Sequence, residues 1–218
     1  MTNIKRILAV ISAAALCLSL ASCESKEEGN NLVGTTNADN LKEDEMPYGA
    51  TLTELKPASD QNLKIITEYD HRYLEKEEVY LVADYLYALS VKDADLISKT
   101  FHKDSIDYII NYSTAESLED YMNVTYDSLC SMLGEDFEFT YIDITEFSNT
   151  ESDPDIFEAA DLRLTSENLG KVTSKKCVTL GGVTMYALAD GSDKLLDNAL
   201  TTPISVCIYQ IDGKYYIV

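Results

Sequence analysis

Residues 204–218, ISVCIYQIDGKYYIV, carry the clearest structural pattern in the chain. Apolar and polar residues alternate on both sides of Asp212-Gly213, and this dipeptide between two alternating runs is the strongest short-range signal of a β-hairpin. We therefore expect two antiparallel strands here, joined by a tight turn at Asp212 and Gly213.

Three earlier segments favour further strands. FEFTYIDITEF (137–147) has apolar residues on both faces, which is typical of a strand with both faces partly covered. KVTSKKCVTL (171–180) and VTMYALA (183–189) are also strand-like, and Gly181-Gly182 between them favours a hairpin turn.

The first half of the chain has helical periodicity. Apolar residues recur at three- or four-residue spacing after Lys76, as on one face of an amphipathic helix. They are Val79, Val82, Leu86 and Leu89. Asp93 is placed to cap a shorter helix that runs through Phe101, and Asp104 starts a third.

Two more helices are expected. Ser113-x-x-Glu116 has the pattern of a capping box before a stripe that runs from Leu118 to Leu133, and Gly134 is a plausible stop. Asp153-Pro154 is typical of a helix start, and we expect Gly170 to close that helix. Helices followed by antiparallel strands indicate an α+β fold with the helices on one sheet face.

Two motifs resemble a known family. Y-L-Y-A-L-x-x-K-D (85–93) on a long first helix and I-D-G-K-Y-Y-I-V (211–218) in the last strands look like the nuclear transport factor 2-like fold. The resemblance implies a curved antiparallel sheet of about four strands that wraps around helices into a cone. It also implies that some relatives use an Asp or His with a Tyr donor inside the cone, and that a homodimer through the sheet face is possible.

The first residues, MTNIKRILAVISAAALCLSLASC, have the pattern of a secretory signal. Lys5 and Arg6 precede an apolar run, residues 7–18, that is too short to span a bilayer. Leu20-Ala21-Ser22-Cys23 resembles the lipobox of Gram-positive-type bacterial lipoproteins, in which the cysteine takes a diacylglycerol before the signal is cut. An ordinary secretory signal with a chance cysteine is the alternative.

These features divide the chain into three parts. Residues 1–22 are the predicted lipoprotein signal peptide, and residues 23–68 a lipidated flexible tether with an extended arm. Residues 46–68 of that arm either dock on the domain or end the tether. Residues 69–218 are the predicted α+β cone domain, held at the cell membrane on its extracytoplasmic face by lipid at Cys23.

The composition limits the partners. The net charge is −21, with 38 acidic and 17 basic residues, and such a surface repels nucleic acid. No second apolar run approaches the length of a transmembrane helix. The membrane, through Cys23, and an unknown small molecule or protein are therefore the expected partners.

Three cysteines remain after Cys17 leaves with the signal and Cys23 takes the lipid. Cys177 and Cys207 fall in strand-like runs and could face each other in a disulfide, or they are buried free thiols, as Cys130 also is expected to be. With no C-x-x-C and no histidine cluster, we expect no metal site and no cofactor.

No catalytic motif stands out, so we assign no catalytic residue. His71 and His102 are expected in solvated loops, and Asp84, off the helical stripe, is expected to face water although it could point inward. Tyrosines could line a ligand pocket, or they could be amphipathic core residues with wet hydroxyls. The pocket candidates are Tyr85, Tyr108, Tyr141 and Tyr209.

These expectations lead to one functional hypothesis and two alternatives. The leading hypothesis is a non-enzymatic lipoprotein that binds a small molecule, a peptide or a protein. The first alternative is an isomerase or hydro-lyase that acts on a small molecule inside the cone. The second is a regulator or inhibitor module for an envelope partner.

Overall fold

One mixed sheet organises the part of the chain that the structure describes. The structure is a computed structural model that describes residues 63–70, 72–150, 154–165, 169–180, 183–200 and 202–218. These residues form five α-helices and a seven-stranded sheet, which confirms the α+β class. The predicted strand number of about four is wrong, because three-residue strands are too short to show an alternating pattern.

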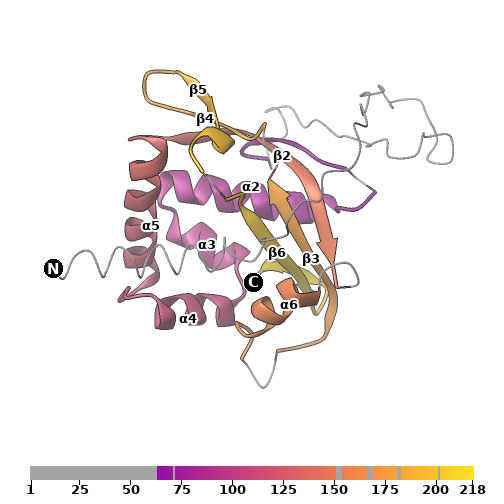
Figure 1. Ribbon diagram of the computed structural model, residues 1–218. Coiled ribbons are helices and arrows are strands. Elements are labelled where there is room, and N and C mark those ends of the chain that lie inside the picture. The colour runs from indigo at the N-terminus through magenta and orange to yellow at the C-terminus, as the bar shows by residue number, and fades with distance from the viewer. Residues whose placement is uncertain (1–62, 71, 151–153, 166–168, 181–182, 201) are drawn as a thin grey trace, which may run out of the picture.

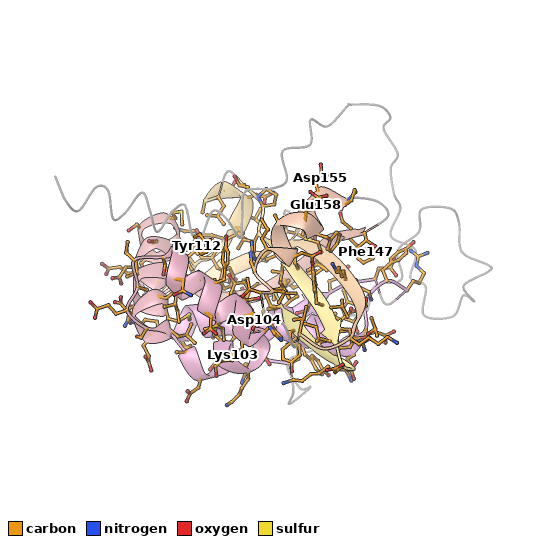
Figure 2. The ribbon with its side chains drawn as sticks, turned by 90° about the horizontal axis from the view of Figure 1, so that it is seen from below. Lys103, Asp104, Tyr112, Phe147, Asp155 and Glu158 are labelled. Atoms are coloured by element: carbon orange, nitrogen blue, oxygen red, sulfur yellow. The ribbon has the colours of Figure 1, made fainter. Side chains whose placement is uncertain are left out.

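The strand order is β5-β4-β2-β3-β6-β7, and β1 pairs with β2 outside this path. The strands are β1 (Ile66–Glu68), β2 (Glu138–Asn149), β3 (Val172–Leu180), β4 (Met185–Ala187), β5 (Asp193–Leu195), β6 (Ser205–Ile211) and β7 (Lys214–Ile217). The helices are α2 (Lys76–Val91), α3 (Ala94–Thr100), α4 (Lys103–Tyr112), α5 (Leu118–Leu133), α6 (Pro154–Asp161) and the 3-10 helix η2 (Leu196–Asn198). Figure 1 shows α2 lying along the sheet, with α4 and α5 further from it and the β4–β5 hairpin projecting at one end.

The C-terminal hairpin forms as predicted. β6 and β7 are antiparallel, and the turn residues Asp212 and Gly213 have φ angles of 50° and 80°. Both positive values fit the type I′ turn that Asp-Gly favours. The Asp212 carboxylate also accepts from the Lys171 backbone N–H at 2.9 Å, which ties the turn to the start of β3.

Gly170 serves this contact rather than a helix end. Its φ is 86°, and a Cβ there would lie 2.3 Å from Asp212 Oδ2. The expected helix end at Gly170 is wrong, because α6 begins at Pro154 as predicted but ends at Asp161. The Asp161 carboxylate there binds Lys175 of β3.

The predicted hairpin between the third and fourth strands is also wrong. β3 and β4 are both antiparallel to β2, so they run in the same direction. Gly181 and Gly182 themselves lie outside the described residues. Thr184, which follows them, lies wholly buried, and its hydroxyl accepts from the Asp143 backbone N–H at 3.2 Å, between the two ladders of β2.

The first helices follow the predicted pattern closely. The four stripe residues of α2 are 0–5% exposed. The Asp93 carboxylate accepts from the Leu96 backbone N–H at 2.8 Å and caps α3. α5 ends at Leu133 with Gly134 as its C-cap, as predicted, but its N-cap is Ser117, whose hydroxyl accepts from the Asp120 N–H at 3.1 Å.

The capping box expected at Ser113 and Glu116 is therefore wrong. Ser113 is the C-cap of α4, and its hydroxyl accepts from the Ala115 N–H at 3.3 Å. The pattern S-x-x-acid occurs twice in this segment, and the second occurrence starts the helix because the first is held by the end of α4.

Apolar side chains cover both faces of the β3–β6–β7 part of the sheet. The larger cluster lies on the α2 side and includes Val178, Val206 and Ile208. The smaller cluster lies on the α6 side. Its buried members are Phe157, Ala160, Cys177, Tyr209, Ile211 and Val218. Neighbouring residues on one strand thus belong to opposite layers, as strand alternation requires.

A buried ion pair joins the start of α2 to β3. Glu78 is 1% exposed, and its Oε2 accepts from Lys176 Nζ at 2.7 Å and from the Glu75 N–H at 2.7 Å. Lys176 Nζ also donates to the Tyr73 carbonyl at 2.8 Å. One carboxylate therefore completes the capping box of α2 and fixes the helix to the sheet.

We predict that Lys176→Met lowers the free energy of unfolding by about 3 kcal/mol, because it leaves a buried carboxylate without its cation. The double variant Glu78→Gln/Lys176→Met should recover a large part of this loss, since both charges are then removed. Urea unfolding followed by circular dichroism measures both.

Glu77→Gln, one residue away at an exposed position, is the control and should change stability by less than about 0.5 kcal/mol. If Lys176→Met lowers the free energy of unfolding by no more than Glu77→Gln does, the ion pair contributes nothing to stability.

Candidate functional site

Two acidic side chains and a tyrosine meet where β1 joins β2. β1 runs parallel to β2, with Glu68 opposite Asp143 and Ile66 opposite Tyr141. Residues opposite each other share a sheet face, as do residues two apart on one strand. Glu68, Asp143 and Tyr141 therefore project together, and the Tyr141 hydroxyl donates a hydrogen bond to Glu68 Oε2. We call these three residues the carboxyl–tyrosine cluster.

The carboxyl–tyrosine cluster projects from the sheet face opposite α2. Ile142 and Ile144 flank Asp143 on β2 and are buried in the main core on the α2 side. Asp143 is nonetheless only 9% exposed, while Glu68 and Tyr141 are half-buried. A carboxyl group in such a place has lost most of its water.

This environment changes the proton affinities of the cluster. Burial, and then the negative charge of Glu68, raise the pKa of Asp143 to about 6. Burial and the hydrogen bond to Glu68 raise the pKa of Tyr141, so its phenol stays protonated at neutral pH. A carboxyl that titrates near neutral pH beside a protonated phenol can exchange a proton with a bound polar group.

The described residues hold no set of three or more His, Cys, Asp and Glu side chains placed to bind a metal ion. The same residues contain no helix of the length and apolar character needed to cross a membrane.

A second feature is an open groove between α2 and the β6–β7 turn. It has a volume of about 400 Å³. Its lining residues are Glu77, Leu81, Gly213, Lys214 and Tyr215. Both signs of charge and the apolar side chain of Leu81 are thus available to a ligand in the groove. Burial and the nearby glutamates of α2 raise the pKa of Tyr215, which keeps that hydroxyl a donor.

The four tyrosines proposed for a pocket have separate surroundings. Tyr85 packs edge-on against Phe101 with ring centroids 5.3 Å apart, and Tyr108 stacks on Tyr112 at 4.1 Å. Tyr141 belongs to the carboxyl–tyrosine cluster. Tyr85 and Tyr209 lie in different apolar layers, on opposite sides of the sheet.

Tyr209 has a structural role. It is fully shielded, and its hydroxyl donates to Asp161 Oδ1 at 2.8 Å, while Lys175 Nζ donates to the same carboxylate at 2.7 Å. Burial and the Asp161 carboxylate raise the pKa of Tyr209. The side chain anchors the end of α6 to the sheet.

Two expectations about polar residues are wrong. Asp84 does not simply face water, because its Oδ1 is buried and has no hydrogen-bond partner among the described residues. Burial raises the pKa of Asp84 against the lowering effect of Lys64. His102 is not a solvated loop residue. Its side chain is 17% exposed, caps α4 through Nδ1 and packs edge-on against Tyr216. Cys23 and His71 lie outside the described residues.

The sequence contained one signal for the carboxyl–tyrosine cluster. Asp143 stands between Ile142 and Ile144 in a strand expected to be covered on both faces, and an acid there is bound to be partly desolvated. Nothing local pointed to Glu68, since its pairing with Asp143 depends on contact between distant segments.

Comparison with known proteins adds no relative, since neither a protein-family model nor a curated protein nor a solved structure matches the chain.

We predict that Asp143→Asn stabilises the protein at neutral pH. The folded-state pKa of about 6 exceeds the ordinary value of 3.8, so the wild type should lose stability as pH rises from about 4 to about 6. The shift corresponds to roughly 3 kcal/mol at most. The variant should match the wild type near pH 3.5 and exceed it by about 1–3 kcal/mol at pH 7.5.

Urea unfolding at a series of pH values measures this difference. Glu138→Gln, at an exposed position on the same strand, is the control and should leave the pH profile unchanged. Identical pH profiles for Asp143→Asn and wild type would contradict the raised pKa.

Proposed function

We propose that this protein is a lipid-anchored, non-enzymatic binding module on the extracytoplasmic face of the cell membrane. The observation that carries the proposal is Leu20-Ala21-Ser22-Cys23 directly after a short apolar run with a basic start. A diacylglycerol on Cys23 supplies two acyl chains, which is the number that stable attachment needs.

Packing supports a binding site on the outer surface. Val82 and Leu86 of α2 and Ile142 and Val178 of the sheet are 0% exposed. Among the described residues, side chains thus fill the space between α2 and the sheet, where a cone-shaped enzyme would hold its substrate. The groove beside Lys214 is the surface that we propose for ligand contact.

The proposed family is the nuclear transport factor 2-like fold. Its support is the order of elements, in which four helices precede every strand except β1, and a sheet that packs against α2 (Figure 1). β2 carries register shifts at Phe139/Tyr141 and Ile144/Glu146, and such irregularities bend a strand. The cone shape itself stays a prediction.

The enzymatic alternative has one observation in its favour. Asp143, with a pKa of about 6 beside the Tyr141 phenol, could serve as a general acid or base for an isomerase or hydro-lyase. The carboxyl–tyrosine cluster projects away from α2, so its substrate would bind outside the helix–sheet interior.

A homodimer through the sheet face also stays a prediction. α6 covers the outer face of β3 and β6, as the second apolar cluster shows. A second copy would therefore pack near β1, β2 and β4.

We predict that Cys23→Ala abolishes labelling by radioactive palmitate and moves the protein out of the membrane fraction. The thioether to Cys23 is the only lipid attachment proposed, so no other group should retain the chain. Cys17→Ala is the matched control and should remain labelled and membrane-bound. A Cys23→Ala chain that still sediments with membranes would overturn the anchoring, and release of the wild type would favour the ordinary secretory signal.

A second experiment tests the groove. We expect a partner captured from cell envelopes by the wild type to be lost with Lys214→Glu, which reverses a charge in the groove. Lys99→Glu, exposed on α3, has the same change in net charge and should keep the partner. Equal loss with both variants would show that only overall charge matters.

A further inference from the structure

Cys177 of β3 and Cys207 of β6 lie directly opposite each other in the antiparallel ladder. Hydrogen-bonded and non-hydrogen-bonded pairs alternate along such a ladder. The Leu180 N–H donates to the Ile204 carbonyl at 2.9 Å, so Leu180 and Ile204 are a hydrogen-bonded pair. Cys177 and Cys207 lie three positions further along the ladder, so they are a non-hydrogen-bonded pair. The Cys207 carbonyl accepts instead from the Val218 backbone N–H at 3.0 Å. The backbone of Cys207 therefore points toward β7 and not toward β3.

This position brings the two thiols together. Non-bonded pairs have Cα atoms about 4.5 Å apart and the closest side chains, and disulfides need a Cα separation of roughly 4.4–6.8 Å. The neighbouring non-bonded pair on the same face confirms that side chains meet here. Its Thr179 and Ser205 hydroxyl oxygens are 2.9 Å apart.

The two thiols differ in access. Cys177 is 3% exposed and Cys207 is half-buried, and both are reduced cysteines in the α6-side cluster. A hydrogen bond with Cys177, and then the positive charge of Arg163, lower the pKa of the Cys207 thiol, against the opposing effects of burial and of Asp161. Cys207 is therefore the thiol that reacts first with a reagent from solution.

We propose that Cys177 and Cys207 are a modification site that closes to a cross-strand disulfide by exchange with an external disulfide. The Cys207 thiolate attacks one sulfur of the external R–S–S–R, forming a mixed disulfide and releasing one R–S⁻. The Cys177 thiolate then attacks Cys207 Sγ and releases the second R–S⁻. Two protein thiols are oxidised, and the external disulfide is reduced to two thiols that take up their protons.

The cross-link would close the chain segment that carries β4, β5 and η2. It joins two neighbouring central strands, β3 and β6, and so holds that segment to the sheet even when its short strands open. Cys130, on α5, takes no part and remains a free thiol.

The experiment uses the full chain carrying Cys17→Ser and Cys23→Ser, so that three thiols remain. After equilibration with oxidised and reduced glutathione and alkylation in denaturant, the thiol count should fall from three to one. The mass should fall by two hydrogens, and proteolysis should yield a linked peptide containing Cys177 and Cys207. Cys130→Ser is the control and should form the same link.

A linkage measurement makes the proposal quantitative. The link should raise the folded-to-unfolded ratio at least about tenfold. By thermodynamic reciprocity, the thiol pair should then close more readily in the native chain than in urea by the same factor.

Two outcomes would overturn the proposal. One is a stable glutathione adduct on Cys207 with Cys177 still free, and the other is an equal tendency to close in buffer and in urea. Cys177→Ser is the negative control, and if that variant fails to fold, Cys207→Ser at the half-buried position takes its place. Neither variant should form an intramolecular disulfide.

The inference does not depend on the lipid anchor. A chain that closes the disulfide in purified form but is found outside the membrane fraction would separate failure of the proposed localisation from failure of this site.

Discussion

The docking of α2 depends on one buried ion pair, and much of the fold depends on α2. The Glu78 carboxylate is almost wholly desolvated, so it is tolerated only where Lys176 reaches it from β3. Together with the buried apolar residues Val82 and Leu86, this contact favours one rotation and one axial position of the helix over the sheet. α3 and α5 then pack against α2, so the positions of these two helices depend on how α2 docks on the sheet.

Sequence patterns correctly predicted the elements that depend on residues close together in the chain. The apolar stripe of α2, the Asp93 cap and the Asp212-Gly213 turn each depend on residues a few positions apart, and all three formed as expected. The failures have non-local causes. A Gly-Gly pair suggested a hairpin, but β3 and β4 both run antiparallel to β2 and therefore in the same direction as each other. Gly170 is required by the close approach of the Asp212 carboxylate and not by a helix end.

The candidate site shows the same division. Residue type alone drew attention to the tyrosines, but in the structure they lie in separate surroundings. Tyr209 is buried and connects the end of α6 to the sheet through its hydrogen bond to Asp161. The raised pKa of Asp143 comes first from burial and then from the negative charge of Glu68, which the parallel register places opposite it. Register between distant segments is set by the whole core, so no inspection of either segment by itself reveals it.

The way the chain enters the sheet has a mechanical consequence. β1 is only three residues long and pairs with β2, and it lies at the end of residues 23–68, the proposed tether and arm. A pull on that tether is borne by β1 before it reaches any other strand. Detachment of β1 would carry Glu68 away from Tyr141 and Asp143 and admit water to both. Tension along the tether and ionisation of a carboxyl on the sheet are thereby connected through a few backbone hydrogen bonds.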